Sequence, residues 1–266
     1  MAIHHWTSLH APDVPSLTGA DSVAVMVLGA IEQHGAHLPL STDLDIGEGL
    51  LDEALRHVAP DRSVFVLPPL SVGASEEHSD FPGTLSLPAP VAQSILEAMG
   101  DNLACSGIRR LMLINSHGGN QAIMQQAALT LRRRHGMLVV KAPYMTLAPP
   151  DDCLPREELV HGLHGGALET AMMLHLHPDR VRRDALGHPP SVGERLAARQ
   201  ARLGPEGDAS FAWLAQDLHP GGVVGNAALA TDALGQQLVS HFGRALAEVL
   251  DDTARFDITD FHAESS

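Results

Sequence analysis

The sequence has few cysteines, few basic residues and no long apolar run, and each shortage excludes a class of protein. Only two cysteines, Cys105 and Cys153, occur in 266 residues, so a disulfide framework or a cysteine zinc site cannot be built. Lys and Arg number 17 against 32 Asp and Glu, a formal net charge of −15. This balance argues against nucleic acid and against an anionic membrane surface, since both require a basic face. The apolar runs are far shorter than the roughly 20 residues of a membrane span.

The remaining composition is that of a globular protein, with 44% apolar and 18% charged residues. The N-terminal stretch MAIHHWTSLHAPDVP has no basic segment followed by an apolar core, so we expect no signal peptide. Together with the low cysteine count, this favours a cytoplasmic protein. We find no internal repeat and no linker that would divide the chain. We therefore expect residues 1–266 to form a single domain.

Apolar runs and helical periodicity alternate along the first half of the chain. The apolar runs predict four strands, at residues 23–28, 63–70, 109–115 and 137–142. Helical spacing predicts helices between them, at residues 46–58, 89–103 and 121–134. This alternation is typical of an α/β fold with a parallel sheet covered by helices.

Beyond residue 145 the alternation ends. A Pro- and Asp-rich loop extends to residue 163, and a loop of this length in a compact domain is usually functional, for example as a lid. We expect one helix from Gly166 to Pro178, an irregular stretch to residue 229, and a long amphipathic helix from Asp232 to Phe256.

Acidic and histidine side chains gather directly after the first predicted strand. The stretch from Gly29 to Asp45 contains Glu32, His34 and Asp43. Glu32 and His34 leave the same face of an extended segment, and Asp43 is far enough downstream to return from a loop. Carboxylate and imidazole without cysteine suit zinc, manganese or iron. The alternative is a solvated acidic loop with a histidine before the next helix.

Similar polar motifs follow the other strands. Glu77 and His78 follow the second strand, and His117 follows the third in a stretch with paired glycines. Those glycines let the backbone approach a ligand, but the Gly-Lys-Ser/Thr spacing of a P-loop is absent. A last motif carries His164 and Glu169, where Glu169 could instead be a capping or ion-paired carboxylate. Because the ends of parallel strands meet at one edge of a sheet, we expect these clusters to converge.

Together these motifs resemble the creatininase (creatinine amidohydrolase) family. The resemblance rests on four motifs in the family's order: E-Q-H-G-x-H-L-P-L-x-T-D at 32–43, E-H-x-x-F-P-G-T-x-S-L at 77–87, N-x-H-G-G-N at 115–120 and H-G-G-x-x-E-T at 164–170. The Gly-rich stretch at 221–235 is also similar. The resemblance implies a three-layer α/β/α fold with a mainly parallel central sheet, two divalent metal ions per chain, zinc foremost, and a homo-oligomer, with a hexamer as the best guess.

Carried over residue by residue, the resemblance implies five metal ligands. Glu32 and His117 would bind one ion and His34 the other, with Asp43 bridging both. Creatininase itself takes its last ligand from a glutamate two residues after the strand-end histidine. That position is Gly119 here, and relatives with H-G-G-N point to Glu169 instead.

The resemblance also suggests the residues that act on substrate. His164 matches the family's catalytic histidine and would protonate the leaving nitrogen, and Glu77 is the second candidate catalytic residue. His78, Gly118 and Gly119 are candidates for substrate contact. His37 is expected to fix its loop by a hydrogen bond.

The reaction predicted is metal-dependent hydrolysis of a carbon–nitrogen bond in a small-molecule amide or cyclic amide. Creatininase proper has a tyrosine where this chain has Gly118, and tryptophans in later loops. Here the tryptophans are Trp6 and Trp213, which argues against creatinine. Family relatives that deformylate formamido-pyrimidines or trim a modified peptide would fit the same metals.

Two rival classes share these ligands. A phosphoesterase or lactonase could use the same two metals, but a phosphate substrate would recruit arginines, and Arg109 and Arg110 begin a strand away from its carboxyl end. A non-catalytic protein that binds metal or a small molecule would keep the ligands but need no proton donor such as His164.

Overall fold

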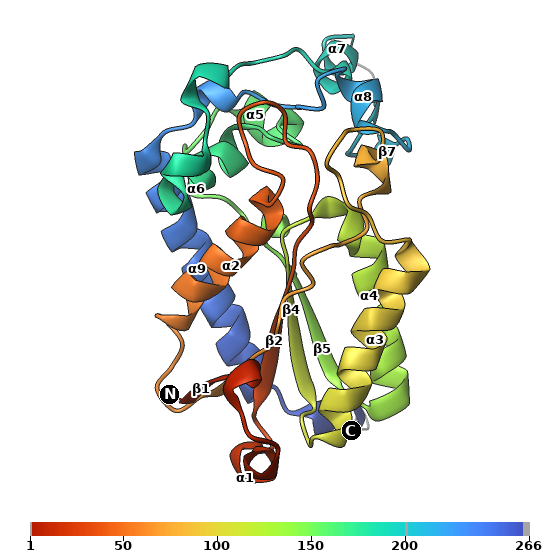
Figure 1. The fold of residues 1–266 in the computed structure, drawn as a ribbon, viewed down its shortest axis with the longest axis vertical. Coiled ribbons are helices and arrows are strands. Elements are labelled where there is room, and N and C mark those ends of the chain that lie inside the picture. Colours follow the sequence, from red (N-terminus) through yellow and green to blue (C-terminus); the bar gives the residue numbers. More distant parts are fainter. Residues whose placement is uncertain (1, 200–201, 263–266) are drawn as a thin grey trace.

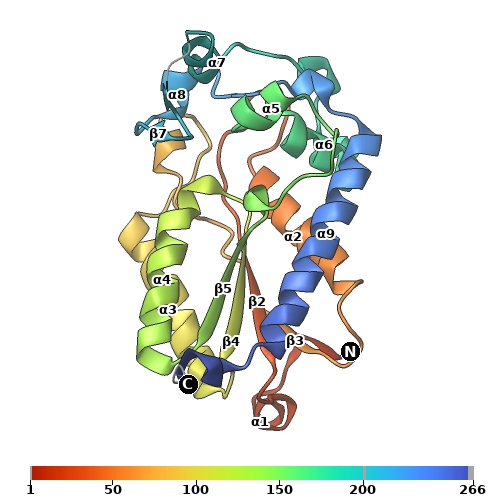
Figure 2. The same ribbon diagram turned by 180° about the vertical axis from the view of Figure 1, so that it is seen from behind.

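The computed structural model describes residues 2–199 and 202–262. At its centre lies a five-stranded parallel sheet in the spatial order β1-β3-β2-β4-β5. The strands are β1 (Ala2–His5), β2 (Val23–Leu28), β3 (Ser63–Val66), β4 (Arg110–Asn115) and β5 (Leu138–Pro143). Helices cover both faces of this sheet (Figures 1 and 2), which confirms the predicted α/β/α fold.

Two groups of long helices form the outer layers. One face is covered by α2 (Thr42–Leu55), α6 (Ala167–Leu176) and α9 (Asp232–Arg255), which contact one another, and the other by α3 (Ala89–Cys105) and α4 (Gln121–His135). The shorter elements are α1 (Val14–Leu17), α5 (Arg156–His161), α7 (Val192–Ala197), α8 (Ala215–Leu218), β6 (Leu203–Gly204) and β7 (Ala209–Ser210). No helix in the described ranges has both the length and the apolar character needed to cross a bilayer.

The central strand β2 is buried on both faces. Val23, Val25 and Val27 pack in the core beneath α9, while the alternate residues from Ala24 to Leu28 pack in the core beneath α3. A strand covered on both sides needs a continuous apolar sequence rather than an alternating one. This is why the run predicted at residues 23–28 matches the observed strand.

The strand order reverses between β2 and β4. The chain goes from β2 through α2 to β3 on one side, whereas β4 and β5 lie on the other side. In open α/β sheets, such a reversal leaves a crevice at the carboxyl ends of the strands. The loops that follow β2 and β4, residues 29–41 and 116–117, leave the sheet at this point.

Several predicted boundaries were wrong. The polar lead contains the edge strand β1, paired with β3, and the second predicted strand ends at Val66, before two prolines. Helix α2 begins at Thr42, so Asp43 lies in its first turn and not in a loop. The long loop predicted at 145–163 contains helix α5.

Candidate metal centre

The structure brings the five predicted ligands together at the carboxyl ends of β2 and β4. Glu32 and His34 lie in the loop after β2, Asp43 in the first turn of α2, His117 just after β4, and Glu169 in the first turn of α6. The first four are at most 4% exposed, and the side chain of Glu169 is 16% exposed. Sheet and helices thus gather three carboxylates and two imidazoles in a mostly buried space.

One group of side chains forms around Asp43 Oδ2. His117 Nδ1 lies 3.2 Å from this oxygen and 3.3 Å from Glu32 Oε2. The three residues offer ligand atoms within 4.8 Å of one another.

A second group forms around the other oxygen of Asp43. His34 Nε2 lies 3.2 Å from Asp43 Oδ1 and 3.8 Å from Glu169 Oε2. The ligand atoms of these three residues also lie within 4.8 Å of one another. Asp43 therefore presents one oxygen to each group, which is the arrangement of a bridging carboxylate.

Several atoms of these groups are buried without a hydrogen bond. They are both carboxylate oxygens of Glu32, Nε2 of His34 and Oδ2 of Asp43, none of which has a partner among the described residues. Leaving such an atom unpaired costs about 1–3 kcal/mol, and more for a charged group. Cations would satisfy all of them, so the residues present fit a pair of divalent ions.

The outer ring nitrogens of the two histidines are held by backbone carbonyls. His117 Nε2 donates to the carbonyl of Ala74 at 2.8 Å, and His34 Nδ1 donates to the carbonyl of Glu32 at 3.1 Å. A carbonyl can only accept, so each ring keeps its proton there and turns its other nitrogen toward the carboxylates. Second partners of this kind orient metal-binding histidines.

In the metal-free protein, protons compensate the buried charges. Burial alone would lower the pKa of His34, but the carboxylates of Asp43, Glu169 and Glu32 together outweigh burial and raise this pKa to about 9. Burial would raise the pKa of Asp43, yet His34 and His117 hold it well below its usual value. Burial raises the pKa of Glu169 to about 7. A metal ion that enters must displace these protons.

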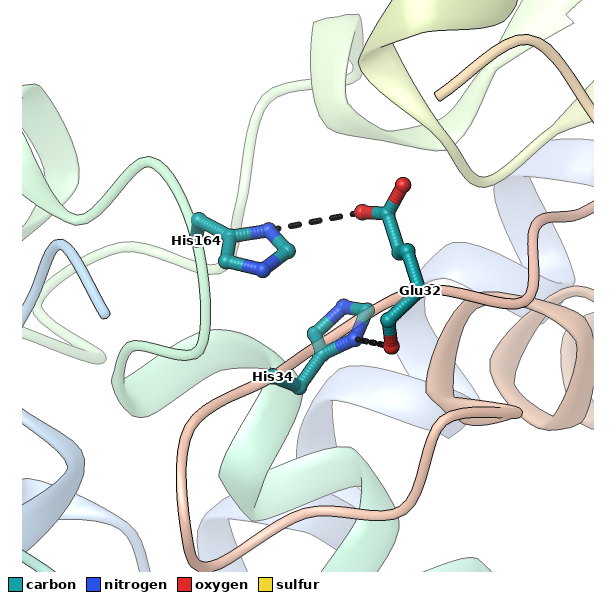
Figure 3. Close-up of side chains that lie close together, drawn as sticks. All are labelled: Glu32, His34 and His164. Atoms are coloured by element: carbon teal, nitrogen blue, oxygen red, sulfur yellow. Dashed lines mark hydrogen bonds and ion pairs between the residues drawn. The ribbon is translucent and has the colours of Figure 1, made fainter. Parts of the chain in front are cut away.

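His164 lies beside Glu32 and His34 (Figure 3), and these three residues also offer ligand atoms within 4.8 Å of one another. Its Nδ1 is 3.6 Å from Glu32 Oε1, and its Nε2 donates to the carbonyl of Gln33 at 2.6 Å. The ring packs between those of His34 and His78, with centroid distances of 4.1 and 4.2 Å. Burial, and next the neighbouring His34, hold the pKa of His164 well below its usual value. Near neutral pH, Nδ1 therefore carries a lone pair that can accept a proton.

The fold and the sequence pattern of the chain are shared with a known family. The sequence pattern of the creatininase family, described as creatinine amidohydrolase, matches residues 7–250. The chain belongs to the creatininase family. Creatininase-family proteins similar to this chain are hydrolases named for action on creatinine or on a precursor peptide.

Individual relatives place the chain within this family. It is 32% identical over 234 residues to the mycofactocin precursor peptide peptidase of Mycolicibacterium smegmatis, with 85% of each chain covered. It is 31% identical over 195 residues to the creatinine amidohydrolase of Pseudomonas putida, covering 66% of this chain and 73% of that one. A solved structure named "Creatininase Mn" matches with a TM-score of 0.78 at 23% identity, covering 95% of this chain and 99% of that one. A creatininase mutant of "Zn-Zn type" matches with a TM-score of 0.74 at 22% identity over 95% of this chain and 98% of that one.

This creatininase-family member has no room for a side chain at Gly119. A Cβ there would lie 2.6 Å from both Glu77 Oε1 and His117 Nε2. The space next to the strand-end histidine is thus filled by Glu77 from another loop. Glu169, in contrast, faces His34 Nε2 at 3.8 Å, and its role as a metal ligand stays a prediction.

The candidate catalytic residue Glu77 and the candidate substrate residue His78 lie next to the ligand group of Glu32, Asp43 and His117. Glu77 Oε1 is 3.5 Å from His117 Nε2, and burial raises the pKa of Glu77. His78 is buried and directs Nε2 to Glu32 Oε1 at 3.4 Å. Gly118 is exposed, and a Cβ built on it would meet nothing within 4 Å. The catalytic role of Glu77 and the substrate contacts of His78, Gly118 and Gly119 stay predictions.

His37 fixes its loop, as expected. Its Nε2 lies 3.0 Å from the carbonyl of Gly165 and 3.1 Å from Thr170 Oγ1. This contact ties the loop after β2 to the start of α6, so the loop that carries His34 is held next to Glu169.

Sequence reasoning missed the buried carboxylate of Glu158. Its oxygens accept hydrogen bonds from the backbone N–H of Ala167 at 2.7 Å and of Asn226 at 2.8 Å. A Cβ at Gly162 or Gly166 would lie 2.5 Å from Glu158 Oε1. The sequence contains one hint of this contact, the glycines at 162, 165 and 166, of which the family motif at 164–170 includes two.

Proposed function

We propose that this chain is a metal-dependent hydrolase that cleaves a carbon–nitrogen bond with the help of two divalent ions. The observation that carries the proposal is the sharing of Asp43, whose two oxygens lie 3.2 Å from His34 Nε2 and 3.2 Å from His117 Nδ1. Unpaired buried atoms in both groups support cation binding. Membership of a hydrolase family supports the reaction class.

The residues divide into two ligand sets. Glu32, Asp43 and His117 would hold one ion, while His34, Asp43 and Glu169 would hold the other. Zinc is our first choice, with manganese or iron as alternatives, since carboxylate and imidazole suit these ions. When bound, such a pair of ions supplies a nucleophilic water near neutral pH and polarises the substrate carbonyl.

His164 would move the proton that the reaction requires. Its Nδ1 carries a lone pair and faces the ligand groups, while Nε2 is held by the carbonyl of Gln33. Nδ1 can accept a proton as the nucleophile attacks and return it to the leaving nitrogen, which is a poor leaving group as an anion. A protein that only bound metal would not need this lone pair.

We propose an amide bond in a peptide or modified peptide as the substrate rather than creatinine. The similarity to the mycofactocin precursor peptide peptidase of Mycolicibacterium smegmatis covers 85% of the chain, against 66% for the creatinine amidohydrolase of Pseudomonas putida. The open space above Gly118 leaves room for a bulky group. A formamide would fit the same ions and is the second candidate. Assembly into a homo-oligomer, hexameric by family resemblance, and a cytoplasmic location stay predictions.

Elemental analysis and a substrate panel test this proposal. We expect close to two divalent ions per chain and hydrolysis of short peptides in preference to creatinine. A chelator should abolish hydrolysis, and zinc or manganese should restore it. One ion or none in active protein, or activity that is indifferent to the chelator, would contradict the two-metal reaction.

A His164→Ala variant separates the enzyme from a binding protein. It should retain both ions and lose hydrolysis by about 10²–10⁴-fold, the contribution of a positioned proton-transfer group. Unchanged activity in this variant would overturn the proton-transfer role.

A further inference from the structure

Gln33 lies between two predicted ligands, and every polar atom of its side chain is engaged. Its Oε1 accepts from the backbone N–H of Gly35 at 3.0 Å, and its Nε2 donates to the carbonyl of Gly222 at 3.0 Å. A backbone N–H can only donate and a carbonyl can only accept. These two backbone groups therefore fix which end of the amide is nitrogen, an assignment that often rests on the hydrogen-bond network alone.

The fixed amide determines the protonation of His78. Gln33 Nε2 lies 2.9 Å from His78 Nδ1, and since the amide nitrogen can only donate, Nδ1 must accept. The proton of the neutral ring is then on Nε2, which points at Glu32 Oε1 from 3.4 Å. His78 cannot take a second proton on Nδ1 without breaking its bond to Gln33.

The main chain of the same residue determines the protonation of His164. Its carbonyl accepts from His164 Nε2 at 2.6 Å, so this nitrogen keeps its proton. The opposite nitrogen, Nδ1, faces Glu32 Oε1 at 3.6 Å. The two rings pack against each other with their centroids 4.2 Å apart and their planes tilted by 30°, yet His78 turns a donor and His164 an acceptor toward the same carboxylate.

We propose that Gln33 is a positioning residue that assigns opposite proton roles to these histidines. The protonated Nε2 of His78 and the unprotonated Nδ1 of His164 then face Glu32 Oε1, at 3.4 and 3.6 Å. The assignment of hydrogen positions follows from the hydrogen bonds alone, while its effect on turnover rests on the proposed function.

The fold leaves space for this amide at Gly222. The φ angle of Gly222 is +76°, a left-handed conformation that side chains rarely adopt, and a Cβ there would overlap the amide of Gln33. The backbone of Gln33 is held as well, since its N–H donates to Thr84 Oγ1 at 3.1 Å. Gln33 is thus fixed by loops from four parts of the chain.

Solid-state NMR of ¹⁵N-histidine-labelled, zinc-loaded protein tests the assignment directly, since zinc is diamagnetic and the method is independent of assembly size. Comparison with a His78→Gln variant identifies the His78 signals. We expect a proton on Nε2 and a bare Nδ1 in the wild type. In Gln33→Glu, a carboxylate oxygen replaces the donor, and Nδ1 should become protonated. Gln237→Glu makes the same charge change at an exposed position on α9 and should leave the spectrum unchanged.

Two results would overturn the proposal: a proton on His78 Nδ1 in the wild type, or a wild-type His78 spectrum in folded Gln33→Glu. If Gln33→Glu does not fold, Gln33→Met keeps the chain length without a donor and should give a mixture of the two His78 tautomers. If His78 in Gln33→Met still carried its proton on Nε2 alone, Gln33 would not be the residue that sets the position of this proton.

Kinetics supply a second readout. Gln33→Glu should lower kcat at least about tenfold, as for a disturbed proton transfer, with KM changed by no more than about threefold. A change confined to KM would show that Gln33 serves substrate binding and not the proton roles. If the wild type hydrolyses nothing in the panel, the proposed function fails, but the NMR result still decides the assignment of His78.

Discussion

Glu169 Oε2 accepts a hydrogen bond of 2.7 Å from the backbone N–H of Gly165, the residue that follows His164. The same oxygen lies 3.8 Å from His34 Nε2. One carboxylate therefore holds the loop of the proposed proton carrier and completes the second ligand group. This double contact makes Glu169 the most informative of the five proposed ligands to change.

Glu169→Gln should lower the metal content from near two ions per chain to near one. The amide keeps the shape of the side chain, but its charge is lost, so the group with His34 and Asp43 becomes a weaker site. Elemental analysis after gel filtration measures the content, and Glu248→Gln, on the exposed face of α9, serves as the control. Two ions retained in Glu169→Gln would show that Glu169 is not a ligand.

Metal affinity should rise with pH. In the metal-free protein, the carboxylates of Asp43, Glu169 and Glu32 together outweigh burial and raise the pKa of His34 to about 9, so at pH 7 the ring is protonated and must release its proton when an ion binds. Below pH 9, each proton released should strengthen binding by about tenfold per pH unit. Zinc titrations in chelator-buffered solutions at pH 7, 8 and 9 measure this slope. A flat profile would mean that the ligands are already free of protons at pH 7.

Sequence patterns predicted the layers of the fold better than its edges. The run at 23–28 matched β2 because a strand buried on both faces must be continuously apolar. Strand β1, with the sequence AIHH, was missed because it is short and half polar and is stabilised by pairing with β3 rather than by its own pattern. Asp43 was placed in a loop because α2 begins before its apolar periodicity does.

The candidate site was predictable as a set of residues but not as a set of contacts. Strand ends and the family motifs indicated Glu32, His34 and His117 from the sequence alone. The partners of Gln33 and Glu158 were not predictable, because both side chains bind backbone groups of glycine-rich loops far along the chain. Every residue offers the same backbone groups, so the sequence does not show which of them a given side chain will bind.

Gly118→Tyr should narrow the range of substrates. The position is exposed and a Cβ meets nothing within 4 Å, so the ring can be placed without disturbing the fold, and it would occupy the space that we assign to a bulky substrate. We expect unchanged metal content and a loss of kcat/KM for peptides at least about tenfold greater than for small formamides, the size of a steric exclusion of roughly 1.4 kcal/mol. Equal losses of kcat/KM for peptides and formamides would show that the bulky part of the substrate does not lie next to Gly118.

Helix α5 carries the carboxylate that fastens the start of α6. Glu158 is 7% exposed, and its two oxygens accept from backbone N–H groups of Ala167 and Asn226. Two residues before Asn226, Val224 pairs with His164 through two backbone hydrogen bonds of 2.7 and 3.0 Å. The segment at 156–161 thus anchors the start of α6. A lid role for the loop at 145–163 stays a prediction.

Glu158→Gln should destabilise the protein although it changes one oxygen to an NH₂ group. Both carboxylate oxygens are acceptors for backbone N–H groups, so the amide must turn a donor toward another donor in a buried place, which costs about 1–3 kcal/mol. Urea unfolding of metal-free protein measures this loss, and the exposed neighbour Glu157→Gln should stay within about 0.5 kcal/mol of the wild type. Because α6 carries Glu169, we also expect weaker binding of one ion in Glu158→Gln. Wild-type stability together with wild-type metal affinity would show that the two hydrogen bonds do not hold the start of α6 in place.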